Sequence, residues 1–267
     1  MEIATAAHAC AANSRRRGPA VGDTRAMPDQ PTNAGAVRPP LSESLRDDRA
    51  RDLARLYESS GLAQHLGMGN RPAVLLIDLF RAFTDPESPL AMPVGELIEP
   101  TARLLREARA LGVPVVHTIV RYHHDAELGV LGEKNPVLRL LTSDSPLAAV
   151  DPRLDPDGAD LVVDKKGASA FHASTLRGIL NALGVDSVVV AGVSTSGCVR
   201  ATVVDAIQLG LRPIVVRECT ADRSAFAHEI ALADIEFRYG DVESLEYVIA
   251  GLHGIVGDRK DDDARRN

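Results

Sequence analysis

The sequence contains few cysteines and no long apolar run, and its acidic residues outnumber its basic ones. Three cysteines among 267 residues, an odd number, do not make a disulfide framework, and we infer a reducing, cytoplasmic setting. The formal net charge of -7 gives the chain as a whole no nucleic-acid-binding footprint. No apolar run reaches the roughly 18–20 residues of a membrane-spanning helix, so we also expect no membrane association.

Two kinds of motif are missing as well. The start of the chain, MEIATAAHACAANSRRRG, carries its arginines after the alanine-rich stretch, whereas a signal peptide carries basic residues before it. The loop GVSTSG (192–197) has neither the lysine of a GxxxxGK[ST] phosphate loop nor the GxGxxG spacing of a dinucleotide site. We therefore expect no signal peptide and no nucleotide binding.

Composition divides the chain into three parts. Residues 1–42 are rich in Ala, Pro, Gly, Asn and Arg, and they contain almost no large apolar residues, so we expect a disordered tail. Residues 43–255 form one domain that begins with a helix over about 44–61, a candidate contact with a neighbouring subunit. Residues 256–267 are a charged run that we expect to be solvated and flexible.

Apolar runs alternate with amphipathic segments through the central part, and the runs are typical of parallel strands buried on both faces. The predicted strands cover 72–78, 113–120, 159–165, 186–193 and 212–218. The predicted helices cover about 97–111, 174–183, 198–209, 225–235 and 242–251. This alternation predicts an α/β protein, a three-layer α/β/α sandwich with a mostly parallel, doubly wound sheet.

Chemically active side chains stand where these strands end. Asp78 ends the first strand, Lys165 and Lys166 end the third, and Cys198 and Arg223 follow the fourth and fifth. Ligands of such sheets bind beyond the carboxyl ends of the strands. A carboxylate, an amine, a thiol and a guanidinium are therefore expected at one edge, which predicts a reactive site there.

Each of these residues also has an ordinary structural interpretation. A free cysteine is most often a small buried apolar residue, although a helix dipole at Cys198 would lower the thiol pKa and favour the nucleophilic thiolate. Asp78 could cap the next turn or exchange a proton with a neighbouring thiol. Arg223 could form a surface salt bridge or clamp a substrate carboxylate. Strand alternation does not decide between Lys165 and Lys166, because strand ends are uncertain by about a residue or two.

Five stretches carry a resemblance to a known family. They are GNRPAVLLIDLFRAFTDP (69–86), VVDKKGASAF (162–171), AGVSTSGCVRATVVDAIQLGLRPIVVRE (191–218), ADR (221–223) and YGDVES (239–244). In combination they resemble the isochorismatase-like cysteine hydrolases, most of all the N-carbamoylsarcosine amidohydrolase branch. The resemblance implies an isochorismatase-like fold and a homo-oligomer, dimer or tetramer. It also implies hydrolysis of a C–N bond in a small-molecule substrate.

The resemblance also implies which residues form the catalytic triad. The family's Asp, Lys and Cys fall on Asp78, Lys165 and Cys198. The family's lysine stands six residues before the Phe of SAF, here Phe171, which selects Lys165 over Lys166.

Substrate-binding groups follow from the same resemblance. It places a cis peptide bond between Val193 and Ser194, with the amides of Ser194 and Cys198 forming an oxyanion hole. Arg223 matches the arginine that binds the substrate carboxylate in the carbamoylsarcosine enzymes, although the stretch reads ADR here instead of GDR.

Histidine placement argues against a metal. The nicotinamidase branch builds a metal site from an Asp and histidines shortly after its first strand, but residues 81–96 contain no histidine. The histidines at 117, 123, 124 and 172 are scattered without metal-ligand spacing, which is typical of polar lining or surface residues. We predict no metal and no cofactor.

The substrate stays open, because the loop over roughly 121–148 matches no branch of the family. N-carbamoylsarcosine, a maleamate-type amide and an antibiotic lactam such as streptothricin would all use the same triad. A catalytically silent binding or assembly subunit on the same fold is a further alternative, which the intact triad disfavours.

Overall fold

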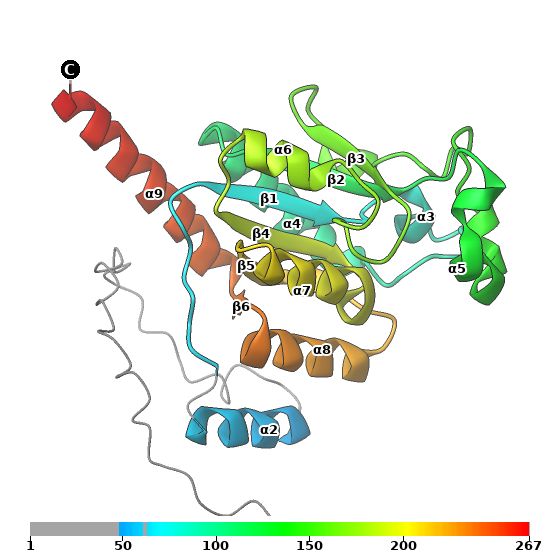
Figure 1. Ribbon diagram of the computed structural model, residues 1–267, viewed down its shortest axis with the longest axis horizontal. Coiled ribbons are helices and arrows are strands. Elements are labelled where there is room, and N and C mark those ends of the chain that lie inside the picture. Colours follow the sequence, from blue (N-terminus) through cyan, green and yellow to red (C-terminus); the bar gives the residue numbers. More distant parts are fainter. Residues whose placement is uncertain (1–47, 61–62, 267) are drawn as a thin grey trace, which may run out of the picture. The chain divides into compact units, whose positions relative to one another are not determined.

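One sheet of parallel strands organises the chain. The computed structural model describes residues 48–60 and 63–266, so the tail expected over 1–42 lies outside the described residues. The strands are β1 (Pro72–Ile77), β2 (Val115–Val120), β3 (Leu161–Lys165), β4 (Ser187–Val193), β5 (Arg212–Ala221) and β6 (Asp241–Glu243). They are ordered β3-β2-β1-β4-β5-β6, and every neighbouring pair is parallel (Figure 1).

The two central strands are apolar along their whole length. The sequences PAVLLI of β1 and SVVVAGV of β4 are buried at every position, as expected for parallel strands covered on both faces. Their register pairs Pro72 with Ser187 and Ile77 with Gly192. Because the two strands end level with each other, the residues that follow them emerge side by side at the carboxyl edge.

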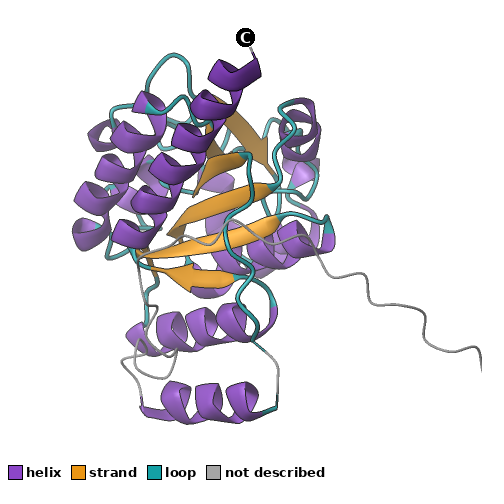
Figure 2. Cartoon of the chain, turned by 90° about the vertical axis from the view of Figure 1, so that its left-hand side faces the viewer, coloured by secondary structure: helices purple, strands orange, loops and turns teal. Residues whose placement is uncertain are grey.

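Helices cover both faces of the sheet (Figure 2). They are α2 (Asp48–Ser59), α3 (Arg81–Thr84), α4 (Gly95–Ala110), α5 (Gly129–Lys134), α6 (Leu176–Ala182), α7 (Arg200–Gln208), α8 (Ala225–Arg238) and α9 (Leu245–Arg266). Side chains of α4 and α9 pack on one face, and side chains of α6, α7 and α8 pack on the other. The doubly wound α/β/α sandwich predicted from the sequence is therefore confirmed.

The C-terminal part differs from the prediction. Residues 241–243 pair with β5 as a sixth strand, where a helix was predicted to begin near residue 242. Three residues are too few to show a strand periodicity, and the pairing with β5 decides their conformation. Helix α9 then runs to Arg266 and includes most of the charged run expected to be flexible. The boundaries of the central domain remain a prediction.

The N-terminal helix lies against α8. Tyr57 of α2 stacks on Phe237 of α8 with ring centroids 4.7 Å apart, and Arg238 of α8 hydrogen-bonds the Tyr57 hydroxyl. Leu56 on the same helix is 65% exposed. A contact between α2 and a second subunit stays a prediction. Within the described residues, none of the helices combines the length and apolarity needed to cross a membrane.

A buried charge network joins the sheet to α4. His117 of β2 is buried, its Nε2 lies 3.0 Å from Oδ2 of Asp160, and Arg109 of α4 donates two hydrogen bonds to the same carboxylate. Burial lowers the pKa of His117, although Asp160 acts in the opposite direction. Burial alone would raise the pKa of Asp160, but Arg109 and His117 outweigh it and lower that pKa.

This network predicts a loss of stability in mild acid. The unfolded chain takes up a proton at His117 near the ordinary pKa of 6.5, whereas the folded chain resists protonation. The free energy of unfolding should therefore fall as the pH drops from about 7 to about 5. In a His117→Gln variant this fall should be smaller by about 1 kcal/mol. Urea unfolding at both pH values measures it, and an equal fall in both proteins would contradict the prediction.

Candidate active site

Three side chains from different strands meet at the carboxyl edge of the sheet. Asp78 follows β1, Lys165 ends β3, and Cys198 lies in a π-helical turn (Thr195–Val199) between β4 and α7. The Lys165 Nζ is 2.9 Å from Oδ2 of Asp78 and 3.3 Å from Sγ of Cys198. The strand order reverses between β1 and β4, which is where ligands bind in doubly wound sheets.

Lys165 is the centre of this group. Its side chain is 0% exposed, and Nζ also donates to the carbonyl oxygens of Gly167 at 2.8 Å and Ala168 at 3.0 Å. Burial alone would lower the pKa of Lys165, but the neighbouring Asp78 and Cys198 outweigh it and raise that pKa. The side chain therefore stays an ammonium ion.

Asp78 is held by the neighbouring strand. Its amide donates to the Thr118 carbonyl at 3.1 Å, and the Thr118 hydroxyl donates to Oδ1 at 3.3 Å. The residue has a φ of 57°, a region that Asp tolerates better than most residues. Burial raises the pKa of Asp78, although the Lys165 ammonium acts to lower it. A carboxyl group with a raised pKa is suited to accept and return a proton.

Cys198 is a thiol in this resting arrangement. Burial and the nearby Asp78 carboxylate raise its pKa to about 12, although Lys165 acts to lower it. The sequence led us to expect a lowered thiol pKa at Cys198, whereas its surroundings, burial first and the Asp78 carboxylate second, act to raise it. A thiolate at this position would therefore require a neighbouring group that accepts the thiol proton.

The turn that carries Cys198 has an unusual backbone. The peptide bond between Val193 and Ser194 is cis, and the Ser194 carbonyl accepts hydrogen bonds from the amides of Gly197 and Val199, which flank Cys198. Ser194 and Cys198 are partly exposed as residues, whereas Thr195 and Val199 of the same turn are buried.

A glycine allows β4 to approach β1 at this point. Gly192 has a φ of 121°, and a Cβ atom there would lie 2.0 Å from the carbonyl oxygen of Ile77. A larger residue would therefore push apart the two strands that lead into Asp78 and Cys198.

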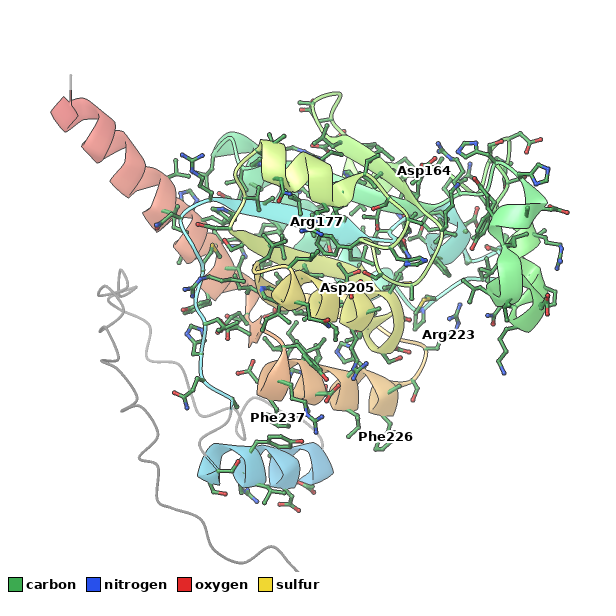
Figure 3. All side chains as sticks on the ribbon, viewed as in Figure 1. Asp164, Arg177, Asp205, Arg223, Phe226 and Phe237 are labelled. Atoms are coloured by element: carbon green, nitrogen blue, oxygen red, sulfur yellow. The ribbon has the colours of Figure 1, made fainter. Side chains whose placement is uncertain are left out.

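Arg223 lies on the side toward which the strands point (Figure 3). The residue is exposed, and its Nη2 donates to the carbonyl oxygen of Leu90 at 2.8 Å. In the described part of the chain, its side chain makes no hydrogen bond to Asp78, Lys165 or Cys198. The structure thus places a cation at the edge of the site, separate from the buried group.

Lys166, the neighbour of Lys165 in the sequence, contacts a different segment of the chain. Lys166 Nζ forms an ion pair with Glu127 at 2.8 Å and lies over the ring of Tyr122, whose hydroxyl donates to the Lys166 carbonyl. Lys166 holds the pKa of Glu127 down, at about 2. The Lys166 side chain therefore anchors the start of the loop over roughly 121–148, which matches no branch of the family. The Lys165 side chain instead reaches Asp78 and Cys198.

Sequence reasoning missed several groups that support the site. Thr118 lies inside a predicted strand and carries no motif that distinguishes it. Asp222 belongs to the ADR stretch, in which the sequence assigned a role only to Arg223. The Asp222 carboxylate accepts hydrogen bonds from the amide and the hydroxyl of Ser196. The Thr195 hydroxyl lies 2.8 Å from Nδ1 of His228. These partners become visible only when distant segments are packed together.

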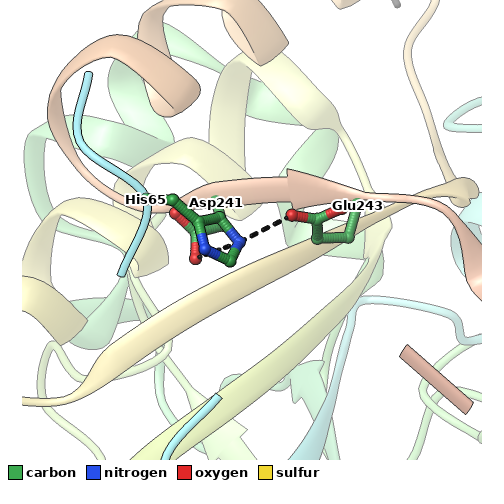
Figure 4. Close-up of side chains that lie close together, drawn as sticks. All are labelled: His65, Asp241 and Glu243. Carbon is green, nitrogen blue, oxygen red and sulfur yellow. Dashed lines mark hydrogen bonds and ion pairs between the residues drawn. The ribbon is translucent and has the colours of Figure 1, made fainter. Parts of the chain in front are cut away.

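A separate group of titratable side chains forms where His65, from the segment before β1, meets Asp241 and Glu243 of β6 (Figure 4). The His65 Nε2 is 2.9 Å from Oε1 of Glu243 and 3.2 Å from Oδ2 of Asp241, close enough together to hold a metal ion. The Asp241 carboxylate also accepts hydrogen bonds from the amides of Leu66 and Gly67. These bonds tie the segment before β1 to β6.

Comparisons with known proteins agree with this architecture. The isochorismatase domain model matches residues 72–246. A maleamate amidohydrolase of Pseudomonas putida is 45% identical over 197 residues, which cover 73% of this chain and 92% of that protein. An N-carbamoylsarcosine amidase of Arthrobacter is 39% identical over 207 residues, 75% of this chain and 78% of that protein.

Solved structures share the fold. A cysteine hydrolase from Pseudomonas syringae pv. phaseolicola superposes with a TM-score of 0.69 at 26% sequence identity. The superposition covers 73% of this chain and 98% of that one.

The surroundings of Cys198 predict opposite effects of two substitutions on thiol reactivity. Asp78→Asn removes the anion that raises the Cys198 pKa, so alkylation by iodoacetamide at about pH 8 should become about tenfold faster. Lys165→Met removes the cation that lowers this pKa and should slow alkylation by a similar factor.

Mass spectrometry of the peptide that contains Cys198 measures both rates separately from the other cysteines. Cys219, which is fully buried, provides the control, and Cys219→Ala should leave the rate at Cys198 unchanged. A change in the same direction in both active-site variants would contradict the electrostatic account.

Proposed function

Since this chain belongs to the isochorismatase family, we propose that it hydrolyses the C–N bond of a small amide through a covalent thioacyl intermediate on Cys198. Relatives named as an amidohydrolase and an amidase support cleavage of a C–N bond other than a peptide bond. The observation that carries the proposal is the buried Lys165 ammonium, in contact with both the Asp78 carboxylate and the Cys198 sulfur. This arrangement contains a nucleophile, a proton acceptor and a fixed cation.

The names of two relatives suggest the class of substrate. Maleamate and N-carbamoylsarcosine both carry a terminal CONH2 group and a carboxylate, and in both two atoms separate the amide carbon from the carboxylate carbon. In maleamate these atoms are the two alkene carbons; in N-carbamoylsarcosine they are a nitrogen and a methylene carbon. We propose a primary amide of this length as the substrate, with Arg223 binding its carboxylate by paired hydrogen bonds.

In the first half of the reaction, Cys198 attacks the amide carbon. The thiol proton passes to the Asp78 carboxylate as the S–C bond forms, and Lys165 stabilises the developing thiolate. The amides of Ser194 and Cys198 bind the oxyanion of the tetrahedral intermediate; removing one such donor typically costs roughly 100- to 1,000-fold in rate. The C–N bond then breaks, and Asp78 returns the proton to the departing nitrogen, which leaves as ammonia.

In the second half, water releases the product. Asp78 accepts a proton from a water molecule, whose oxygen attacks the thioacyl carbon. The C–S bond breaks, and the proton returns to Sγ of Cys198. Maleamate would give maleate, and N-carbamoylsarcosine would give a carbamate that decomposes to sarcosine and carbon dioxide. Asp78 and Cys198 carry the protons of attack and release, and the newly formed acid loses its own proton to water.

Ammonia release from maleamate and N-carbamoylsarcosine tests this function. We expect hydrolysis of one or both by the unmodified chain and loss of turnover in Cys198→Ala, while Cys219→Ala stays active. Mass spectrometry of a quenched reaction should show the thioacyl adduct on the Cys198 peptide. Turnover that survives in Cys198→Ala would rule out the covalent route, and a streptothricin opened in place of both amides would rule out the substrate class.

The role of Arg223 has its own test. Arg223→Met should lower kcat/KM for maleamate by about 10- to 100-fold, because one charge-assisted contact with the substrate carboxylate is lost. The methyl ester of maleamate lacks that charge, so its hydrolysis should change little. An equal loss for acid and ester would show that Arg223 does not bind the carboxylate.

Two further properties remain proposals. The resemblance implies a homo-oligomer, either a dimer or a tetramer, and light scattering of the purified chain measures it. The low cysteine content favours a cytoplasmic location, which fractionation of the source cells tests.

A further inference from the structure

Asp222 joins the two halves of the candidate site. Its Oδ2 accepts hydrogen bonds from the amide of Ser196 at 2.8 Å and from the Ser196 hydroxyl at 2.7 Å. Its Oδ1 accepts a hydrogen bond from the backbone amide of Arg223 at 2.8 Å. One carboxylate thus connects the turn that carries Cys198 with the residue proposed to bind the substrate carboxylate.

Backbone pairing brings these two segments together. Val193 at the end of β4 pairs with Ala221 at the end of β5, so the residues that follow each strand start next to each other. The next contact along the turn joins Thr195 to His228 of α8, and the Ser224 hydroxyl caps the start of that helix. Residues 222–228 therefore hold the turn at two neighbouring positions.

A carboxylate suits this position better than an amide would. Three donors converge on the two oxygens of Asp222, and an ionised carboxylate accepts hydrogen bonds at both. An asparagine has one accepting oxygen, so its NH2 group would face either Ser196 or the Arg223 amide. Asp222→Asn should therefore break the connection on one side while it keeps the size of the side chain.

We propose that Asp222 is a positioning residue that sets the distance between the oxyanion-binding turn and Arg223. This inference rests on the proposed function. The distance between the turn and Arg223 must match the distance between the amide carbon and the carboxylate of the substrate. Asp222 thereby makes the enzyme selective for the length and shape of the segment between those two groups.

A pair of geometric isomers measures this selectivity. Maleamate and its trans isomer, fumaramate, contain the same atoms and charge, but the cis double bond holds the carboxylate nearer to the amide carbon. A site with a fixed spacing should distinguish them, because a misplaced reacting group loses rate steeply. We expect the unmodified enzyme to favour maleamate by about tenfold or more in kcat/KM.

The variants form a graded series. Asp222→Asn should reduce the ratio of the two kcat/KM values to within about threefold, through a rise in KM and a fall in kcat for maleamate. Ser196→Ala removes one of the three hydrogen bonds and should give an intermediate ratio. Asp205→Asn on α7 makes the same change of charge away from the turn and should keep the original ratio.

Two outcomes would overturn the inference, and they differ in what they say about the proposed function. If the unmodified enzyme hydrolyses these amides but Asp222→Asn lowers both activities equally, Asp222 only stabilises the fold and the proposed function stands. If the unmodified enzyme hydrolyses neither isomer nor N-carbamoylsarcosine, the proposed function fails and this inference fails with it. Urea midpoints and iodoacetamide alkylation at Cys198 show whether each variant keeps the folded site.

Discussion

A buried ammonium ion organises this molecule at the carboxyl edge of its sheet. Burying a lysine is costly unless charges and hydrogen-bond acceptors surround it. Here Lys165 has a carboxylate, a sulfur and two carbonyl oxygens within 3.3 Å of its nitrogen. These acceptors come from the segments that follow β1, β3 and β4, so the cation is buried where the carboxyl ends of these three strands meet.

The burial of Lys165 next to Asp78 and Cys198 also determines the chemistry available at the site. Burial raises the pKa of the Asp78 carboxyl and of the Cys198 thiol, so both groups hold protons more tightly than they would in water. The Lys165 ammonium opposes both shifts and favours the anionic forms. A proton exchanged between Asp78 and Cys198 would therefore stay close to one fixed positive charge, as the proposed attack of Cys198 on an amide requires.

In two pairs of adjacent residues, the two side chains make different contacts. Lys165 enters the reactive group, whereas Lys166 anchors the loop that begins near Tyr122. In a similar way, the Asp222 carboxylate holds the turn that contains Cys198, and Arg223 next to it presents a cation at the edge of the site. Packing of α8 and pairing of β5 with β4 bring this second pair to the turn.

The sequence by itself determined the alternation of strands and helices, because local periodicity and strand length are properties of neighbouring residues. It also brought Asp78, Lys165, Cys198 and Arg223 to one edge, since parallel strands place their ends together. The family resemblance then singled out one lysine and the turn after β4. Residues alone could not separate Lys165 from Lys166, because an error of one residue in a strand end reverses the side-chain direction.

Only the tertiary structure decided the rest. The strand β6 is three residues long and forms only because it pairs with β5, so no local sequence pattern indicates it. The direction of the Cys198 pKa shift depends on burial and on Asp78, a residue 120 positions earlier in the chain. The role of Asp222 depends on hydrogen bonds to a turn formed by another strand. Such properties arise from groups that are distant in sequence and close in space, and local sequence patterns do not encode them.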